Sequence, residues 1–297
     1  NVLSLTVVMP NGEIVCTRSR ARKSSAGYDL TRLLIGSEGT LGIITEVTVR
    51  LWGTPEAELT ALCPFADFSD AVETVMETIQ LGIPVARIEF LDEVAAKGIG
   101  QYAKLDLPPS PTLILDFHGT PRGVEEAAAN FKALAAEHGS LAFESAKSPE
   151  ERKKIWDARH GALFSALALA PGRKPVITDV CVPISALAAC IKETRADIDA
   201  SGLSAPIVGH VGDGNFHCVF MIDIEKPEEV SAAKGLNDRL VMRALGFGGT
   251  ATGEHGVGSG KIGFLESEHP TTLPIMRAIK QAIDPLGIMN PGKIFRM

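Results

Sequence analysis

The chain has 297 residues, of which 45% are hydrophobic and 22% are charged, and its formal net charge is −7. A chain of this length and composition can bury a large core, in one large domain or in two ordinary ones. Because the charge is mildly negative and no cluster of Lys and Arg offers a basic face, the composition argues against nucleic acid as the main partner.

Residues 1–55 are predicted to be rich in β-structure. Pro10-Asn11-Gly12-Glu13 is a turn sequence between two strand-like runs, which predicts a hairpin. Gly53-Thr54-Pro55 marks the end of this first domain. The expected elements are, in chain order, a strand at 3–8, a strand at 14–17, a helix at 30–34 and a strand at 43–51.

Residues 56–270 are predicted to form an α+β domain, in which an antiparallel sheet carries helices on one side. The strand-like runs lie at 59–63, 86–90, 112–117, 142–143 and 176–182, followed by a strand–turn–strand at 206–222. The helical patterns lie at 68–80, 124–138, 149–169, 184–201 and 228–245. Residues 271–297 hold a last helix at 273–283 and a turn-rich tail, and are expected to return to the first domain.

Five cysteines are widely spaced along the chain and lie mostly within apolar stretches. An odd and scattered set of this kind predicts buried, reduced thiols in a reducing compartment instead of a disulfide framework. No apolar run reaches the roughly 18 residues that a membrane-spanning helix needs, so none is expected.

His210-Val211-Gly212-Asp213-Gly214-Asn215-Phe216-His217 is the strongest sign of a functional site. Asp213-Gly214 is a favoured two-residue hairpin turn, and a turn centred there predicts that His210 and His217 face each other with Cβ atoms about 4.5–5.5 Å apart. Two imidazoles at that separation suit one divalent cation. The alternative is a solvated hairpin with incidental histidines, but the apolar flanking residues favour buried strands, in which imidazoles need partners.

Thr252-Gly253-Glu254-His255-Gly256-Val257-Gly258 places a carboxylate and an imidazole among glycines. Such a segment indicates unusual backbone angles or a close approach to a ligand. Glu254 could complete a His-His-Glu metal site of the catalytic kind, with open positions for a substrate. His255 is expected to point elsewhere and to act as a base. The alternative is a flexible loop with incidental charges.

Gly36-Ser37-Glu38-Gly39-Thr40-Leu41-Gly42 places a glycine at every third position before a strand. This spacing permits backbone N–H groups to approach a phosphate or a ring system. The segment is not the dinucleotide-binding pattern, in which a helix follows the glycines, so taken alone it is weak evidence for a cofactor.

These segments resemble a known family. Residues 27–30 and 36–45 resemble the second half of the FAD-binding domain of the vanillyl-alcohol-oxidase superfamily. The histidine hairpin, the segment around Glu254 and Met289-Asn290-Pro291-Gly292-Lys293 resemble the FAD-linked oxidase C-terminal domain that follows it. The chain is therefore identified as a member of the FAD-binding oxidase/transferase type 4 family, and the resemblance covers essentially all of it.

Within the family, residues 86–92 and 178–183 are most similar to the cytochrome-linked D-lactate dehydrogenases. The resemblance implies oxidation of D-lactate or a similar small (R)-2-hydroxy acid to the 2-oxo acid. A divalent metal, zinc or manganese, on His210, His217 and Glu254 would hold the substrate, and His255 would take the hydroxyl proton while a hydride moves to FAD. The family's pattern places a further set of residues along the flavin: Gly36, Ser37, Glu38, Gly39, Thr40, Gly42, Ile43, Ile44 and Asn290.

Arg159 aligns with a substrate-side arginine of the related D-2-hydroxyglutarate enzymes, so the resemblance implies a role in the catalytic site. The alternative is an exposed salt-bridge residue on a helix. Where those enzymes carry a Thr and a Lys for a distal carboxylate, this chain has Leu163 and Ile177. A carboxylate left unpaired beside them would be strongly disfavoured, which predicts a small or apolar substrate.

Family members also carry an N-terminal half with the Gly-rich loop that holds the FAD pyrophosphate. The resemblance implies that such a half is needed in cis or in trans, together with an electron acceptor that is a cytochrome, a quinone or a flavoprotein. In a bacterium, the expected location is the cytoplasm, including the periphery of the inner membrane. In a eukaryote, it is the mitochondrion.

Other functions stay open from the sequence alone. Within the family, the alternatives are a glycolate oxidase-type enzyme and a D-2-hydroxyglutarate dehydrogenase. Outside it, the same His-His-Glu set could serve a non-flavin metal-binding protein or a hydrolase. A non-catalytic subunit that completes a partner's FAD site is disfavoured, since a scaffold has no need of His255 beside a metal.

Overall fold

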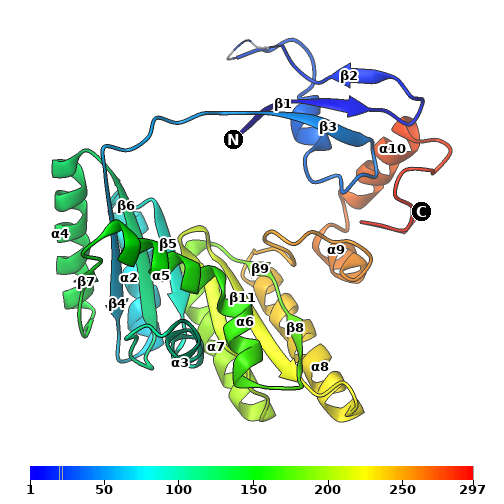
Figure 1. Cartoon of the computed structure of the whole chain (residues 1–297). Coiled ribbons are helices and arrows are strands. Elements are labelled where there is room, and N and C mark those ends of the chain that lie inside the picture. Colours follow the sequence, from blue (N-terminus) through cyan, green and yellow to red (C-terminus); the bar gives the residue numbers. More distant parts are fainter. Residues whose placement is uncertain (20, 22, 297) are drawn as a thin grey trace. The chain divides into compact units, whose positions relative to one another are not determined.

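The computed structural model describes residues 1–19, 21 and 23–296. The chain divides into two compact units: unit 1 combines Asn1–Thr54 with Glu254–Met297, and unit 2 is the continuous stretch Pro55–Gly253 (Figure 1). The second domain was expected to reach residue 270, but the compact unit ends at Gly253. The next helix belongs with unit 1 because its Leu265 packs against Leu273 and Phe295.

Unit 1 contains a three-stranded antiparallel sheet with the order β2-β1-β3. Leu5 and Val7 of its central strand form the core with Leu34 and Leu41, and Ile279 and Ile283 of the last helix pack against them. The elements are β1 (Val2–Val8), β2 (Ile14–Cys16), α1 (Leu30–Leu34), β3 (Ile43–Val49), α9 (Ile262–Glu268) and α10 (Leu273–Ile283). All of these except α9 are predicted from the sequence.

Unit 2 is built on an eight-stranded antiparallel sheet with the order β7-β4-β6-β5-β10-β11-β8, in which β9 also pairs with β11. All eight residues of β11 are buried, as expected for a strand that is covered on both faces. The strands are β4 (Ala57–Pro64), β5 (Arg87–Leu91), β6 (Thr112–Gly119), β7 (Glu144–Ser145), β8 (Lys174–Ile177), β9 (Val180–Cys181), β10 (Ile207–His210) and β11 (Asn215–Ile222).

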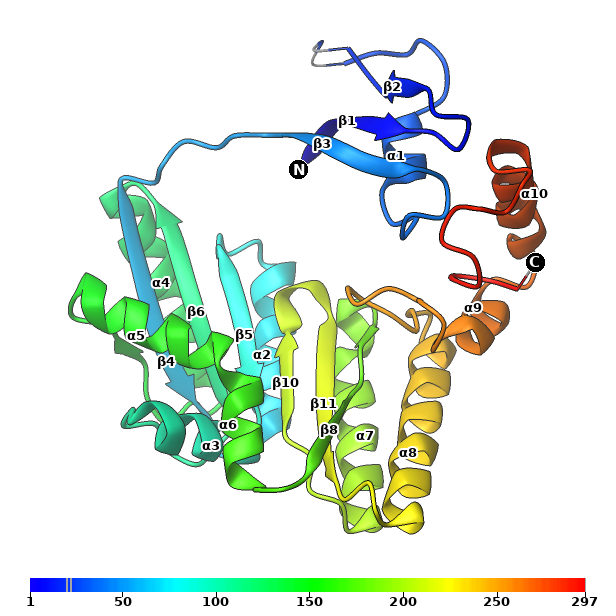
Figure 2. The same cartoon turned by 45° about the vertical axis from the view of Figure 1, so that its right-hand side comes forward.

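The helices of unit 2 cover both faces of this sheet, so the expectation of helices on one side is wrong (Figure 2). Successive residues of a strand point to opposite faces. Phe117 of β6 packs against Phe131 of α4 with ring centroids 6.1 Å apart, whereas Ile114 of the same strand packs with α3 and α5 on the other side. The helices are α2 (Phe68–Gln80), α3 (Glu93–Ala103), α4 (Pro121–Glu137), α5 (Pro149–His160), α6 (Ala162–Leu169), α7 (Leu187–Ser201) and α8 (Pro227–Gly246).

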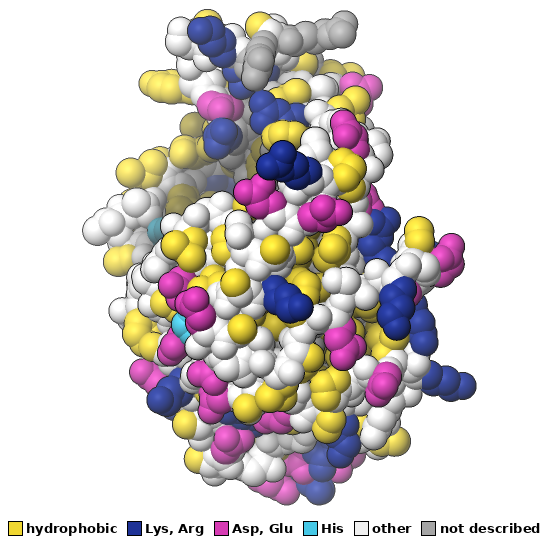
Figure 3. Space-filling model, turned by 90° about the vertical axis from the view of Figure 1, so that its left-hand side faces the viewer, with side chains coloured by type: hydrophobic (Ala, Val, Ile, Leu, Met, Phe, Trp, Pro, Cys, Tyr) yellow, Lys and Arg dark blue, Asp and Glu magenta, His cyan; other side chains and the backbone are white. Residues whose placement is uncertain are grey.

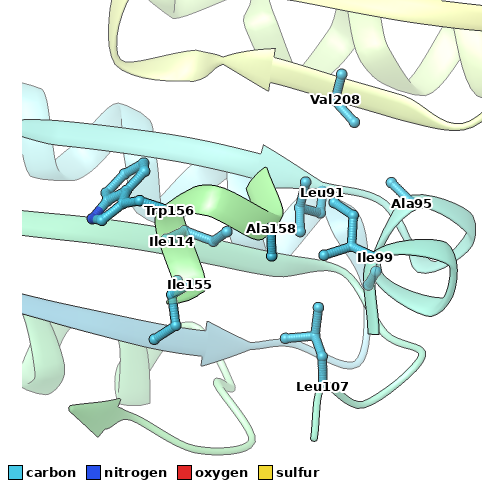
Figure 4. Close-up of a cluster of buried hydrophobic side chains, with 10 residues drawn as sticks. Leu91, Ala95, Ile99, Leu107, Ile114, Ile155, Trp156, Ala158 and Val208 are labelled. Carbon is cyan, nitrogen blue, oxygen red and sulfur yellow. The ribbon is translucent and has the colours of Figure 1, made fainter. Parts of the chain in front are cut away.

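A buried cluster fixes helices α3 and α5 against the sheet. Ile155, Trp156 and Ala158 of α5 meet Leu91 and, from the neighbouring strands, Ile114 and Val208 (Figure 4). The single helix expected at 149–169 is broken at Gly161, a residue of low helix propensity, into α5 and α6. This break lets α5 cover β5 while α6 covers β11.

The surface and the thiols agree with the composition. On the face that Figure 3 shows, acidic and basic side chains alternate with apolar ones and no basic surface is continuous. Of the five cysteines, all free thiols, Cys63, Cys190 and Cys218 are buried, Cys181 is half-buried and Cys16 is exposed. Within the described residues, no helix combines the length and the apolar character needed to traverse a bilayer.

Candidate metal and substrate site

The two histidines lie on the predicted hairpin, but the pairing differs from the prediction. His210 pairs with Asn215, and His217 pairs with Val208. The four residues between the strands, Val211 to Gly214, form a turn that begins with one turn of 3-10 helix. The expected pairing of His210 with His217 across a two-residue turn is therefore wrong by two positions.

A contact outside the hairpin explains this longer turn. Gly214 has a φ of +80°, and the peptide group of Val182 is so near that a Cβ at Gly214 would lie 2.1 Å from its carbonyl oxygen. The Val182 N–H donates to the Gly214 carbonyl at 3.0 Å. The two-residue turn also needs a positive φ at Asp213, which this residue does not have.

The register shift is even, so it leaves both histidines on the same face of the sheet. Their ring centroids are 5.8 Å apart, and the ring planes are inclined by 84°. The predicted convergence of His210 and His217 is thus confirmed, although as diagonal neighbours and not as a directly opposed pair.

Each imidazole is held at its Nδ1 atom. Nδ1 of His210 lies 2.7 Å from Oε1 of Glu89, and Nδ1 of His217 lies 3.0 Å from the carbonyl oxygen of Thr178. A carbonyl oxygen can only accept, so the His217 proton sits on Nδ1 and the lone pair of the neutral ring on Nε2. This arrangement is the one by which proteins orient histidines that bind metals.

Glu254 follows directly on Gly253, the last residue of unit 2. Ligand atoms of His210, His217 and Glu254 all lie within 4.8 Å of one another, and they are the one set of three such residues found in the described chain. The predicted His-His-Glu set is brought together.

The segment before Glu254 is fixed by a buried carboxylate. Asp179 accepts hydrogen bonds from Nδ2 of Asn215 at 2.9 Å and from Oγ1 of Thr252 at 2.7 Å. A Cβ at Gly253 would lie 2.1 Å from the Asn215 amide nitrogen, so only glycine lets the backbone pass there. Asp179 also lies 3.8 Å from Nδ1 of His217.

His255 does not point away from Glu254, contrary to the expectation. Its Nε2 lies 3.4 Å from Oε1 of Glu254, and the side chains are 45% and 48% exposed. Opposite directions for neighbouring side chains require an extended strand, whereas the backbone bends here. The carboxylate of Glu38 accepts the N–H groups of Val257 and Gly258, at 2.7 and 2.8 Å, and so holds the loop that follows His255.

Arg159 is buried in unit 2, with 9% of its surface exposed, so the alternative of an exposed helical residue is wrong. Its guanidinium pairs with Glu89, the carboxylate that also holds His210. All three residues line a cavity of about 460 Å³. The remaining lining residues are Ile79, Val85, Ala86, Arg87, Ile88, Trp156, His160, Gly212 and Asp213.

Leu163 and Ile177 lie on the other side of His217. Leu163 packs against the cluster that contains Val219, and Ile177 pairs with Val219 in the sheet. Val219 follows His217 by two positions and shares its face. The surface beside His217 is therefore apolar, in contrast to the charged cavity beside His210.

The residues expected along the flavin lie in unit 1, in the segment 36–44, whose last two residues begin β3, and at Asn290 in the tail of the chain. Asn290 donates from Nδ2 to the carbonyl oxygen of Glu38, which joins the segment 36–44 to the tail of the chain. Gly36 and Gly39 have positive φ angles of 78° and 73°. At position 42 a glycine is favoured by close packing, because a Cβ on Gly42 would lie 2.6 Å from Cγ1 of Val7. Ser37 and Thr40 are buried, and Ile43 and Ile44 are exposed.

A buried lysine connects the same two parts of the chain. Lys280 donates to the carbonyl oxygens of Thr40 at 2.7 Å and Met289 at 2.9 Å, and to the carboxylate of Asp284. Burial acts to raise the pKa of Asp284, but the bonds from Lys280, Met289 and Ile288 outweigh it and hold this pKa below its ordinary value.

Two cysteines near the histidines, Cys181 and Cys218, are not part of the His-His-Glu set. Burial, with the charges of Asp213 and Asp179, raises the pKa of Cys181. Burial raises the pKa of Cys218 to about 12. Both groups are therefore neutral thiols at physiological pH in the metal-free chain.

Three site residues are not evident from the sequence: Glu89, Asp179 and Asn215. Each is the partner of a residue far away in the chain, and Glu89 is 121 positions from His210. The one available signal is a lone carboxylate inside an apolar strand, as in Ile88-Glu89-Phe90, since a buried charge needs a partner.

The comparison with known proteins shows the family of this chain. The family model for FAD linked oxidases, C-terminal domain, matches residues 54–294, and the chain belongs to this family. The expected α+β fold of such a domain is thereby confirmed.

Two curated relatives resemble the chain over its full length. It is 44% identical to "Probable D-lactate dehydrogenase, mitochondrial" of Danio rerio over 301 residues, which cover 100% of this chain and 61% of the relative. It is 46% identical to "D-lactate dehydrogenase [cytochrome], mitochondrial" of Arabidopsis thaliana over 295 residues, 99% of this chain and 52% of the relative. The chain thus spans about half to three-fifths of their lengths.

Among solved structures, 4-ethylphenol oxidase from Gulosibacter chungangensis has a similar fold. The TM-score is 0.77 at 17% identity, over 99% of this chain and 65% of that one. At this identity the likeness concerns the fold alone.

Proposed function

We propose that this chain is the substrate- and cation-bearing part of an FAD-dependent dehydrogenase that oxidises D-lactate or a similar small (R)-2-hydroxy acid to the 2-oxo acid. The observation that carries the proposal is the convergence of His210, His217 and Glu254 within 4.8 Å, in a chain of the FAD-linked oxidase family. The names of the two curated relatives support the class of substrate.

His210, His217 and Glu254 fit a divalent cation such as zinc or manganese, since nitrogen and carboxylate ligands suit both. When bound, the cation would supply a Lewis acid for the carboxylate and hydroxyl of the substrate, and the flavin would supply the hydride acceptor. Glu89, Thr178 and the anchored Gly253 hold the three ligands in place beforehand.

His255 is proposed as the base that takes the proton of the substrate hydroxyl. Its imidazole adjoins Glu254 and is about half exposed, so it can be reached by a small substrate. Glu38 fixes the loop after it through two backbone N–H groups, which keeps the imidazole in one place. A positioned base of this kind contributes about 10²–10⁴-fold to the rate.

The segment 36–44 and Asn290 are proposed to lie along the flavin. In support of this proposal, Lys280 and Asn290 both join the segment to the tail of the chain. The pyrophosphate-binding half would be supplied in cis or in trans. The Arabidopsis relative's name supports a cytochrome as electron acceptor, and a quinone or a flavoprotein is the alternative. Mitochondrial location is proposed for a eukaryotic source, on the names of both relatives.

The side chain of the substrate is proposed to meet the apolar surface beside His217, at Leu163, Ile177 and Val219. A second carboxylate there would lose its hydration without gaining a partner. D-lactate should therefore be preferred over D-2-hydroxyglutarate.

The test is a substrate and metal assay on the complete gene product with FAD. We expect flavin absorbance, bound zinc or manganese, and reduction of the flavin by D-lactate but not by L-lactate. His217→Ala should abolish the metal and the activity. His118→Ala should leave the bound metal and the activity unchanged, because His118 lies on the same sheet but pairs with Asp116.

Three outcomes would contradict this proposal in different ways. A colourless but metal-loaded protein would indicate a non-flavin metal protein. A preference for D-2-hydroxyglutarate would overturn the argument from Leu163 and Ile177, and a preference for glycolate would indicate a glycolate oxidase-type enzyme.

A further inference from the structure

Glu89 divides its two carboxylate oxygens between two partners. Oε1 lies 2.7 Å from Nδ1 of His210. Oε2 accepts from Arg159 twice, from Nε at 3.1 Å and from a terminal nitrogen at 2.7 Å. The side chains of Glu89 and Arg159 are only 9% and 11% exposed, so the pair is shielded from water.

We infer that Glu89 and Arg159 are positioning residues for His210. The carboxylate fixes the ring with its proton on Nδ1 and its Nε2 toward Glu254 and His217, and the guanidinium fixes the carboxylate. The inference rests on the proposed function, because it concerns a ligand of the proposed cation site. It gives Arg159 a role different from the substrate contact that the family resemblance implies.

The geometry of Arg159 supports this role. The guanidinium directs two N–H groups to one oxygen of Glu89, which leaves the other oxygen for the imidazole. The planar donor group of an arginine sets the plane of a carboxylate, which the point charge of a lysine cannot do. The arginine is itself held by its helix, since its neighbours Ala158, Trp156 and Ile155 are buried in the core cluster (Figure 4).

Charge compensation is the second argument. A carboxylate buried beside an imidazole is strongly disfavoured if it has no cationic partner. Arg159 provides this partner at 2.7 Å from Oε2 of Glu89 and leaves Oε1 to His210. The two N–H groups that Arg159 gives to Glu89 are not available to a substrate anion.

The two histidines thus differ in how they are held. His217 is oriented by the backbone carbonyl of Thr178, which no substitution removes. His210 is held at its Nδ1 atom by a side chain, that of Glu89, so this contact can be tested by mutation. Acceptors of this kind behind metal-binding histidines contribute about 10–100-fold to metal affinity.

The test is the double variant Glu89→Leu/Arg159→Met, which removes both charges together and leaves neither one buried alone. The matched control is Arg173→Met/Glu229→Leu. This ion pair, with a nitrogen–oxygen distance of 2.5 Å, belongs to the same unit, next to the end of β11 that is remote from His217. If the double variant does not fold, Glu89→Gln is measured in its place. This substitution keeps the volume of the side chain and still weakens the acceptor for His210.

Two measurements follow on the complete protein. In the metal-free protein, nitrogen–proton NMR of the imidazoles should show His210 with its proton on Nδ1, and the double variant should lose this single form. Zinc affinity, measured by competition with a chelator, should fall about 10–100-fold in the double variant and stay unchanged in the control.

An unchanged tautomer and an unchanged zinc affinity in the double variant would overturn the inference. A normal zinc affinity together with a raised KM in Arg159→Met would also overturn the inference. This result would show that Arg159 contacts the substrate. If the wild type binds no zinc or manganese at all, the proposed cation site fails, and the NMR result still decides whether Glu89 and Arg159 orient His210.

Discussion

His255 has an internal counterpart in His269. Each histidine follows a glutamate, and in both pairs Nε2 lies 3.4 Å from Oε1 of that glutamate. The exposed fractions of the two imidazoles, 45% and 37%, are also similar. The local contact therefore does not distinguish them. What distinguishes His255 is that Glu254 converges with His210 and His217.

On the proposed role of His255 as the base, we expect His255→Gln to lower kcat by about 10²–10⁴-fold with a smaller effect on KM, because the substrate hydroxyl would lose its proton acceptor. Steady-state kinetics with D-lactate measure this change. His269→Gln should stay within about twofold of the wild type, as is usual for an exposed residue that is not part of the proposed site. Equal losses in the two variants would remove the basis for His255 as the base.

Asp92 is a buried carboxylate at the start of α3. It accepts the N–H of Ala95 at 2.8 Å and the N–H of Ile207 at 2.8 Å, and lies 3.3 Å from Arg195. Burial raises its pKa to about 7; the two backbone bonds and Arg195 oppose this rise, and Glu93 adds to it. The folded chain thus keeps a proton on Asp92 that the unfolded chain releases near pH 4.

This raised pKa predicts a stability that falls with pH. The contribution of protonated Asp92 is complete below about pH 4 and is lost as the pH rises through about 7, since only the folded state holds the proton in this window. The difference in the free energy of unfolding between wild type and Asp92→Asn should shrink by on the order of 2 kcal/mol from about pH 5 to about pH 8. Urea titrations at several pH values measure it, and a constant difference would contradict the raised pKa.

At the scale of elements, long periodic segments are predicted well and contacts between elements are not. Helices α2 and α10 have the predicted bounds, 68–80 and 273–283. Helix α3 was missed because it contains Gly98 and Gly100, which lower helix propensity. The structure gives the reason for Gly98: a Cβ there would lie 2.7 Å from Cδ1 of Leu169, so the glycine lets α6 approach.

The candidate site shows the same division. His210, His217 and Glu254 were predicted because each lies in a short motif with its own turn chemistry. The register of the hairpin was not predicted correctly. Val182 occupies the space beside Gly214, and nothing in the hairpin sequence indicates this contact. The role of Glu89 was not predicted for a similar reason, because β5 is a neighbour of β10 only in the folded sheet.

The turn of the hairpin can be tested with two matched glycines. Gly214 and Gly172 have φ angles of +80° and +81°, but a Cβ at Gly172 would meet nothing within 4 Å. Both Gly→Ala variants bear the cost of a left-handed alanine, and Gly214→Ala must also displace Val182. We expect Gly214→Ala to be less stable than Gly172→Ala by about 1–3 kcal/mol, measured by chemical unfolding. Equal losses would show that the Val182 contact does not set the turn.

At the scale of the molecule, unit 2 is one continuous stretch with its own core, whereas unit 1 is assembled from both ends of the chain. A continuous stretch with its own hydrophobic core should fold alone. We expect a fragment of residues 55–253 to unfold cooperatively. The change can be followed by the fluorescence of Trp156, the one tryptophan in that range, which is 8% exposed. A fragment with solvent-exposed tryptophan emission and no cooperative transition would contradict this.

The divided sequence of unit 1 has a consequence for synthesis of the protein. Lys280 bonds to Thr40 across 240 positions, and α10 covers Leu5 and Val7 from the far end of the chain. At about 5–20 residues per second, a ribosome needs roughly 12–48 seconds to make the intervening 240 residues. Strand β1 is made at least that long before its covering helix, so its apolar face lacks this cover while unit 2 is synthesised.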